Sequence, residues 1–245
     1  MKHPAERSVT RLPKPCLHPA HLPVALLTLV LLAPPAVRAA EEHHHHQHPE
    51  PVSGADPHAH HRAMLEQAQP GPATATDVTL HNATLLTQNG AQVRFASDVI
   101  ADRIVVMDFV YTTCTTVCPV LSAVFGQVQE RLGDRLGQEV SLVSVSVDPV
   151  RDTPPRLKAY ADRHRAQDGW IWLTGDKSQV DQVLTGLGAY APRFEDHPAM
   201  VLVGDGRSGT WIRFFGFPGP DQILAAVDEL SAARQAAAAA QSLQE

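Results

Sequence analysis

The apolar positions of the chain separate a polar first third from a core in which strand and helix patterns alternate. Ile104–Val110 is a continuous apolar run broken only by Asp108, which is typical of a strand covered on both faces. Residues 140–147 alternate with a period of two and predict a second strand. Asn89-Gly90 is a strong two-residue hairpin signal. The other predicted strands are at 78–87, 91–95, 170–173, 200–203 and 210–215.

Helical spacing separates these strands. Pro119 lies in the first turn of a predicted helix that continues to about Leu132 with apolar residues on one face. A second helix is expected after Thr153, which we expect to cap it. Further helices are predicted at 177–187 and from 220 to about 234, where an alanine-rich tail at 235–245 extends the last one. The order predicts an α/β fold with a mixed central sheet, helices on both faces and an N-terminal β-hairpin.

The first 39 residues have the pattern of an export signal. Basic residues such as Arg7 and Arg11 precede an apolar run at 24–33, and Ala39 suits a cleavage site. The run is shorter than the roughly 20 residues that a membrane span needs. We therefore expect a cleaved signal peptide, with an uncleaved N-terminal anchor as the alternative. Both predict a periplasmic or otherwise exported protein whose membrane contact is limited to that anchor.

Residues 40–75 have the composition of a disordered linker rich in histidine and proline. Residues 41–61 carry clustered histidines without apolar periodicity. This stretch is either a weak scavenger of metal ions or an inert tether, since clustered imidazoles bind Cu(II), Ni(II) and Zn(II). The predicted folded domain at 76–234 has a normal size for a single core.

The charge of the chain excludes one large class of partner. The formal net charge is −6 and the isoelectric point is near 6.1. No basic stripe with interleaved aromatic residues occurs in the core, so nucleic acid is not expected as a partner. We expect a monomer.

The cysteines carry the candidate chemistry. Cleavage after Ala39 removes Cys16 and leaves Cys114 and Cys118, which suit a redox pair, a metal pair or a local disulfide. A helix N-terminus lowers the pKa of a cysteine, and a spacing of four brings two sulfurs close together. Two thiolates suit Cu(I), or Zn(II) with more ligands. His197, just before a predicted strand, is the best candidate for a third ligand.

The motifs YTTCTTVCP, SVSVDPVRDTP and DHPAMVLVGDG, together with LTG after a tryptophan-rich strand, resemble the Sco/SenC copper chaperones over about 76–230. The resemblance implies a thioredoxin-like fold and copper bound by Cys114, Cys118 and His197. It also implies a copper-accepting partner, a subunit of cytochrome c oxidase, to which such proteins deliver copper or whose cysteines they keep reduced.

A thiol-disulfide oxidoreductase or redox sensor is the alternative function, with Cys114 and Cys118 as its catalytic pair. Under the first function the protein is a metallochaperone and not an enzyme. Pro198 departs from the family pattern and resembles the cis-proline that faces the dithiol of thioredoxins, which favours the alternative.

We expect that deleting residues 41–61 lowers total Cu(II) uptake and leaves the tight copper site intact, because the removed imidazoles are additional ligands. Metal analysis after dialysis against Cu(II) measures the uptake. A variant of full length with serine at each histidine of the segment controls for chain length. Equal uptake by all three proteins would show that the tether is inert.

Overall fold

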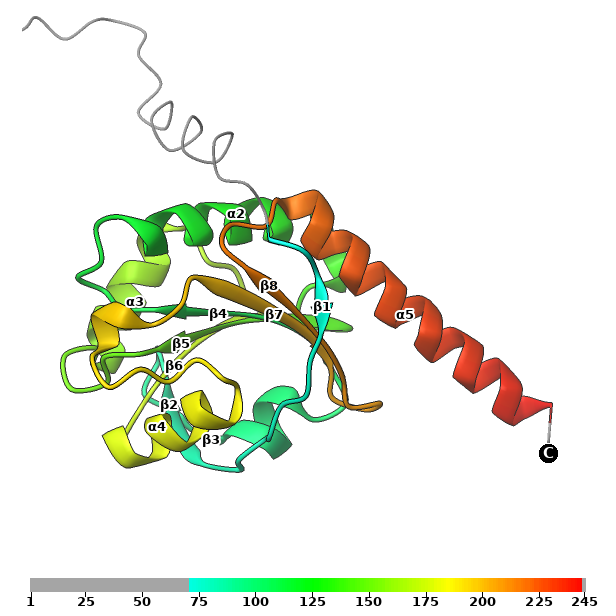
Figure 1. Cartoon of the computed structure of the whole chain (residues 1–245), viewed down its shortest axis with the longest axis horizontal. Helices are drawn as coiled ribbons and strands as arrows, with labels where there is room; N and C mark the ends of the chain where they lie inside the picture. The colour runs from blue at the N-terminus through cyan, green and yellow to red at the C-terminus, as the bar shows by residue number, and fades with distance from the viewer. Residues whose placement is uncertain (1–70, 244–245) are drawn as a thin grey trace, which may run out of the picture. The chain divides into compact units, whose positions relative to one another are not determined.

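The computed structural model describes residues 71–243, and the strands of this part of the chain form one sheet (Figure 1). The strands are β1 Thr74–Ala75, β2 Thr84–Thr87, β3 Gln92–Arg94, β4 Ile104–Val110, β5 Val140–Ser146, β6 Trp170–Thr174, β7 Met200–Asp205 and β8 Thr210–Phe215. Their order across the sheet is β1-β8-β7-β4-β5-β6-β2-β3. The buried β4 therefore lies in the middle of the sheet, between β7 and β5.

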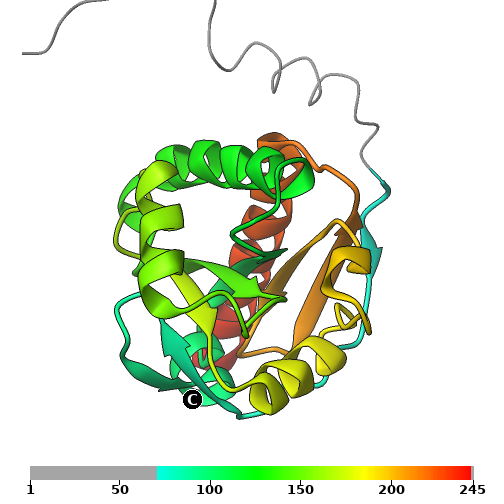
Figure 2. The same ribbon diagram turned by 90° about the vertical axis from the view of Figure 1, so that its left-hand side faces the viewer.

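The directions of the central strands decide which loops meet. β4 runs parallel to β5, and β5 runs parallel to β6. β7 runs antiparallel to both β4 and β8. The segments that follow β4 and β5 and the segment that precedes β7 therefore leave the sheet at the same edge, which faces the viewer in Figure 2.

Helices cover both faces of the sheet (Figure 1). Alternate side chains of β4 point to opposite faces, so Val106 joins one apolar cluster and Met107 the other. The helical elements are η1 Phe95–Ile100, α2 Val117–Leu132, η2 Gly133–Arg135, α3 Pro154–Arg163, α4 Lys177–Gly186, η3 Phe194–Asp196 and α5 Pro220–Ser242. α2, α3 and α5 close the first cluster, and η1 and α4 close the second.

This arrangement confirms the predicted α/β fold with its mixed sheet and N-terminal hairpin. β4 has the predicted bounds, and the hairpin turns at Gly90, whose φ is 78°. The first hairpin strand begins at Thr84 and not at 78. Thr153 is the N-cap residue of α3, but its hydroxyl makes no capping hydrogen bond, so that detail of the prediction is wrong.

Two elements have no counterpart in the sequence prediction. β1 lies in residues assigned to the linker, and it pairs with β8 through Thr74 and Ala75. The π-helix η1 buries Phe95, Val99 and Ile100, a spacing that fits neither a strand nor an ordinary helix. The predicted signal segment and the histidine-rich tether lie outside the described residues. Within residues 71–243, every helix is too short or too polar to cross a membrane.

Gly204 on β7 lies opposite Trp211 on β8, and a Cβ there would come 2.1 Å from the buried indole ring. We expect Gly204→Ala to destabilise the fold by about 1–3 kcal/mol, because the ring has to shift within a packed core. Urea unfolding measures the change. Gly126→Ala in the middle of α2 is the control, since a Cβ there meets no atom within 4 Å and alanine favours helix. Equal stability of both variants would contradict the close packing.

Candidate metal centre

The candidate site lies at the sheet edge where three loops meet (Figure 2). Tyr111 follows β4, and the segment after it leads through Cys114 to the start of α2 at Val117. The segment after β5 contains Asp148 and Asp152, and His197 precedes β7. The pairing of β4 with both β5 and β7 therefore brings residues from three distant parts of the sequence to one edge.

The two cysteines lie together under the surface. Cys114 is 7% exposed and Cys118 is fully buried, and both are free thiols. The backbone N–H of Cys118 donates to the Cys114 sulfur at 3.4 Å. Thr116, the N-cap residue of α2, makes no capping bond with its side chain. The sulfur of Cys114 thus accepts a hydrogen bond from the first turn of α2, where backbone N–H groups lack partners within the helix.

The thiols differ strongly in acidity. A hydrogen bond from the Cys118 thiol lowers the pKa of Cys114 to about 4, and further bonds from the backbone N–H groups of Cys118 and Thr116 and from Tyr111 act in the same direction. The same thiol–sulfur bond, together with burial, raises the pKa of Cys118. At neutral pH the pair therefore holds one thiolate on Cys114 and one proton on Cys118.

His197 presents one ring nitrogen without a partner. Its Nδ1 lies 2.7 Å from the carbonyl oxygen of Phe194, and since a carbonyl only accepts, Nδ1 carries the hydrogen. Nε2 of the neutral ring then has a free lone pair, and it is buried with no hydrogen-bond partner. Buried polar atoms are normally paired, so Nε2 is suited to an external ligand such as a metal ion.

The structure brings the predicted ligands together in part. Cys114 and Cys118 are in contact, whereas His197 reaches them through Tyr111, whose ring centroid lies 5.7 Å from that of the imidazole. Within residues 71–243, no three His, Cys, Asp or Glu side chains form a group that could hold a metal ion. Convergence of the imidazole on the two sulfurs therefore stays a prediction.

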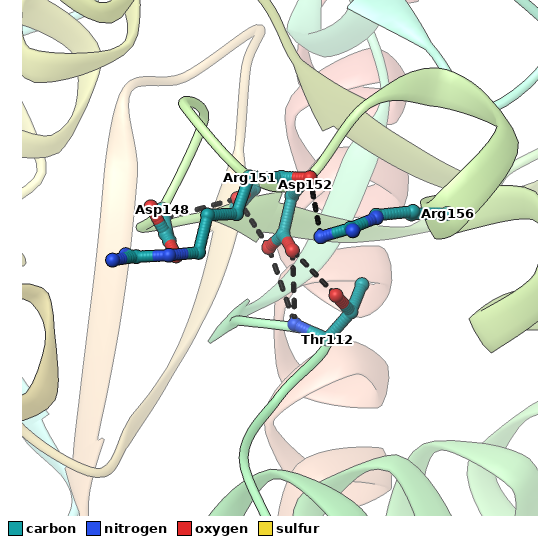
Figure 3. A network of polar contacts seen from close by, with 6 residues as sticks. Thr112, Asp148, Arg151, Asp152 and Arg156 are labelled. Carbon is teal, nitrogen blue, oxygen red and sulfur yellow. Dashed lines mark hydrogen bonds and ion pairs between the residues drawn. The ribbon is translucent and has the colours of Figure 1, made fainter.

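A polar network holds the loop that carries the cysteines (Figure 3). Asp152 is fully buried and accepts hydrogen bonds from the backbone N–H of Thr112 and, at 2.6 Å, from its hydroxyl. Ser146 donates to the same carboxylate at 2.7 Å. Asp148 pairs with Arg151 at 3.0 Å within the same loop. The bond from Thr112 to Asp152 was not predicted, because the sequence places the two residues 40 positions apart.

Aromatic contacts connect this network to His197. The Arg151 guanidinium lies over the Phe194 ring, 5.3 Å from its centroid. Phe194 in turn meets Tyr111 edge-on at 5.0 Å, and Tyr111 meets His197 edge-on. The segment before β7 is therefore attached both to the loop after β4 and to the loop after β5.

Asp108 is a buried acid on the sheet face that Cys118 packs against. Its Oδ1 accepts from Ser144 at 2.6 Å, and its Oδ2 has no partner. Burial raises the pKa of this carboxyl to about 7. When ionised, Asp108 adds to the effects that raise the pKa of Cys118. The sequence signal was present, since Asp108 is the single polar residue of the strand, but it indicated only a covered strand.

Pro198 does not support the comparison with thioredoxins. The described residues contain no cis peptide bond, so the bond before Pro198 is trans. The prediction that this proline resembles the cis-proline of thioredoxins is therefore wrong.

Comparison with known proteins gives one family. The family model described as SCO1/SenC matches residues 73–230. The protein SenC of Rhodobacter capsulatus is 36% identical over 107 residues, which cover 44% of this chain and 46% of SenC. The chain spans about half the length of the curated relatives that it matches.

Solved structures show the same fold. The copper-bound ScoI of Bradyrhizobium japonicum is 26% identical, with a TM-score of 0.52, and the match covers 63% of this chain and 99% of ScoI. BsSco, described as a member of the Sco family of cytochrome c oxidase assembly proteins, is 24% identical with a TM-score of 0.55, covering 65% of this chain and 96% of BsSco. These likenesses confirm the predicted thioredoxin-like fold.

We expect Cys118→Ala to raise the pKa of Cys114, because the variant loses the thiol that donates to its sulfur. In the reduced wild type, alkylation of Cys114 by iodoacetamide should stay rapid as the pH falls from 8 to about 5, and should slow only near pH 4. In the variant this decline should begin at a higher pH. Thr115→Ser on the exposed loop is the control, and identical pH profiles for all three proteins would contradict the assignment of the shared proton.

Proposed function

Because the chain belongs to the SCO1/SenC family, we propose that it is an exported copper-binding metallochaperone with Cys114, Cys118 and His197 as its copper ligands. The observation that carries the proposal is the unpartnered Nε2 of His197, buried at the same sheet edge as a cysteine pair that already holds one thiolate. Two soft sulfur donors and one imidazole form a set that suits Cu(I).

The protonation states of these three residues also suit copper binding. Nδ1 of His197 donates to a carbonyl, and this arrangement leaves Nε2 as the nitrogen that binds metal. Cys114 is ready to bind as a thiolate, while Cys118 has to release its proton when copper arrives. Copper is the cargo here, and the burial of Cys114 and Cys118 keeps their sulfurs from water and from other thiols.

The proposed acceptor is a copper-binding subunit of cytochrome c oxidase. The family resemblance and the description of BsSco as an assembly protein of that oxidase support this choice. The export signal expected at 1–39 supports a periplasmic or otherwise exported location for this function.

A thiol-disulfide oxidoreductase is the second candidate, and the unequal acidity of the two thiols favours it. Cys114 is a thiolate at neutral pH and could attack a disulfide of the partner protein. The partner's leaving thiolate takes up a proton, and a mixed disulfide forms. Cys118, once deprotonated, then attacks Cys114 and releases the partner as a dithiol, so that this chain is oxidised by two electrons.

We expect Cys114→Ala, Cys118→Ala and His197→Ala each to weaken binding of one Cu(I) by at least tenfold, because each removes one of three ligands. Anaerobic competition with a Cu(I) chelator measures the affinity. His81→Ala is the matched control, since His81 belongs to the segment before β2 and not to one of the three loops of the site. Unchanged affinity of His197→Ala would remove that ligand from the proposal.

The same variants separate the two functions. Reduction of a model disulfide substrate requires both cysteines but not His197, whereas copper retention requires all three. A wild type that reduces the substrate rapidly and binds Cu(I) no better than His197→Ala would favour the oxidoreductase.

A further inference from the structure

Tyr111 is the residue that contacts both halves of the candidate copper centre. Its carbonyl accepts from the backbone N–H of Cys114 at 3.0 Å, and its side chain is among the groups that lower the pKa of Cys114. On its other side, the ring meets His197 edge-on, with 5.7 Å between centroids and 83° between planes. Tyr111 therefore contacts Cys114 on one side and His197 on the other.

We propose that Tyr111 is a positioning residue of the copper centre, whose ring orients His197 and whose hydroxyl donates a hydrogen bond to the sulfur of Cys114. This inference rests on the proposed copper function. It assigns to one side chain two separable roles, one carried by the ring and one by the hydroxyl.

The Tyr111 ring limits the orientations that the His197 imidazole can adopt. The ring of His197 has one hydrogen bond, from Nδ1 to the Phe194 carbonyl, which leaves the ring plane free to tilt about that bond. Edge-on packing against Tyr111 restricts the tilt, and the same Tyr111 ring meets Phe194 edge-on at 5.0 Å. The carbonyl and the ring of Phe194 therefore act together with Tyr111 to hold Nε2 in a single direction.

Contacts of the neighbouring residues fix the position of Tyr111. The next residue, Thr112, is tied to the buried Asp152 through its backbone N–H and its hydroxyl. Phe194 carries the Arg151 guanidinium on its ring, and Arg151 is paired with Asp148. Tyr111 thus stands on a rigid support at the end of β4, which a positioning residue requires.

The Tyr111 hydroxyl affects the electron density on the Cys114 sulfur. A thiolate has lone pairs enough to bind a metal ion and to accept a hydrogen bond. A donor on the sulfur withdraws density, which weakens binding of Cu(II) more than binding of Cu(I), and hydrogen bonds around a cysteine sulfur tune metal potentials in this way. The phenol of Tyr111 should therefore favour the reduced metal ion.

The test compares Tyr111→Phe, which keeps the ring, with Tyr111→Leu, which removes it. Tyr190→Phe is the control, because Tyr190 is 44% exposed on the protein surface. For Tyr111→Phe we expect one copper per chain, a thiolate-to-Cu(II) absorption band at lower energy, and a Cu(II) affinity raised about tenfold relative to Cu(I). That ratio corresponds to a potential about 59 mV lower for one electron.

For Tyr111→Leu we expect weaker or lost nitrogen hyperfine coupling in the paramagnetic resonance spectrum of the Cu(II) form, since the imidazole is no longer directed at the metal. An unchanged absorption band in Tyr111→Phe overturns the role of the hydroxyl. Full nitrogen coupling in Tyr111→Leu overturns the role of the ring.

A measurement without copper separates this inference from the proposed function. In the metal-free reduced protein, nuclear magnetic resonance of the His197 side chain should show one tautomer and fixed contacts to Tyr111 in the wild type and in Tyr111→Phe. Tyr111→Leu should show an averaged ring. If the wild type binds no copper but His197 is ordered only when the aromatic ring is present, the positioning role stands and the copper function fails. An imidazole that averages equally in all variants overturns the positioning role.

Discussion

The hydrogen bonds that the Cys114 sulfur accepts from Cys118 are the interaction on which the candidate centre depends. They join the end of the loop after β4 to the first turn of α2, and they leave a single proton between two buried sulfurs. A buried charge is costly unless it is hydrogen-bonded, and here backbone N–H groups, a thiol and a phenol share the stabilisation. The chemistry of the site thus follows from the position of one sulfur at a helix start.

The direction of β7 explains why the remaining donor arrives at the same place. A parallel strand beside β4 would put its preceding loop at the opposite edge, whereas the antiparallel pairing of β7 brings His197 to the end of β4. The loop after β5 completes the edge, because β5 is parallel to β4. Asp152 uses that proximity to anchor Thr112, so the cysteine loop is supported from a neighbouring strand and not only from its own.

Local patterns in the sequence predicted much of this structure, and contacts between distant segments account for the rest. The apolar run Ile104–Val110 defined β4 to the residue, since burial on both faces leaves an unmistakable composition. The bond from Thr112 to Asp152 and the edge-on contact of Tyr111 with His197 were missed, because neither periodicity nor spacing encodes which loops share an edge. The hydroxyl of Thr153 failed as a cap for a related reason, since a cap residue type shows where a helix begins without establishing the bond.

The long last helix extends away from the edge of the sheet that carries the candidate site. α5 starts just after β8 reaches the edge that carries the cysteine loop, and it runs away from that edge over 23 residues, roughly 34 Å at 1.5 Å per residue (Figure 1). Its buried residues end at Ser231, Arg234 still pairs with the buried Asp205, and its last turns are exposed. A fluorophore or immobilising group attached to those turns would leave the three loops of the candidate site facing solution. The end of this helix is therefore a suitable attachment point for surface-based measurements.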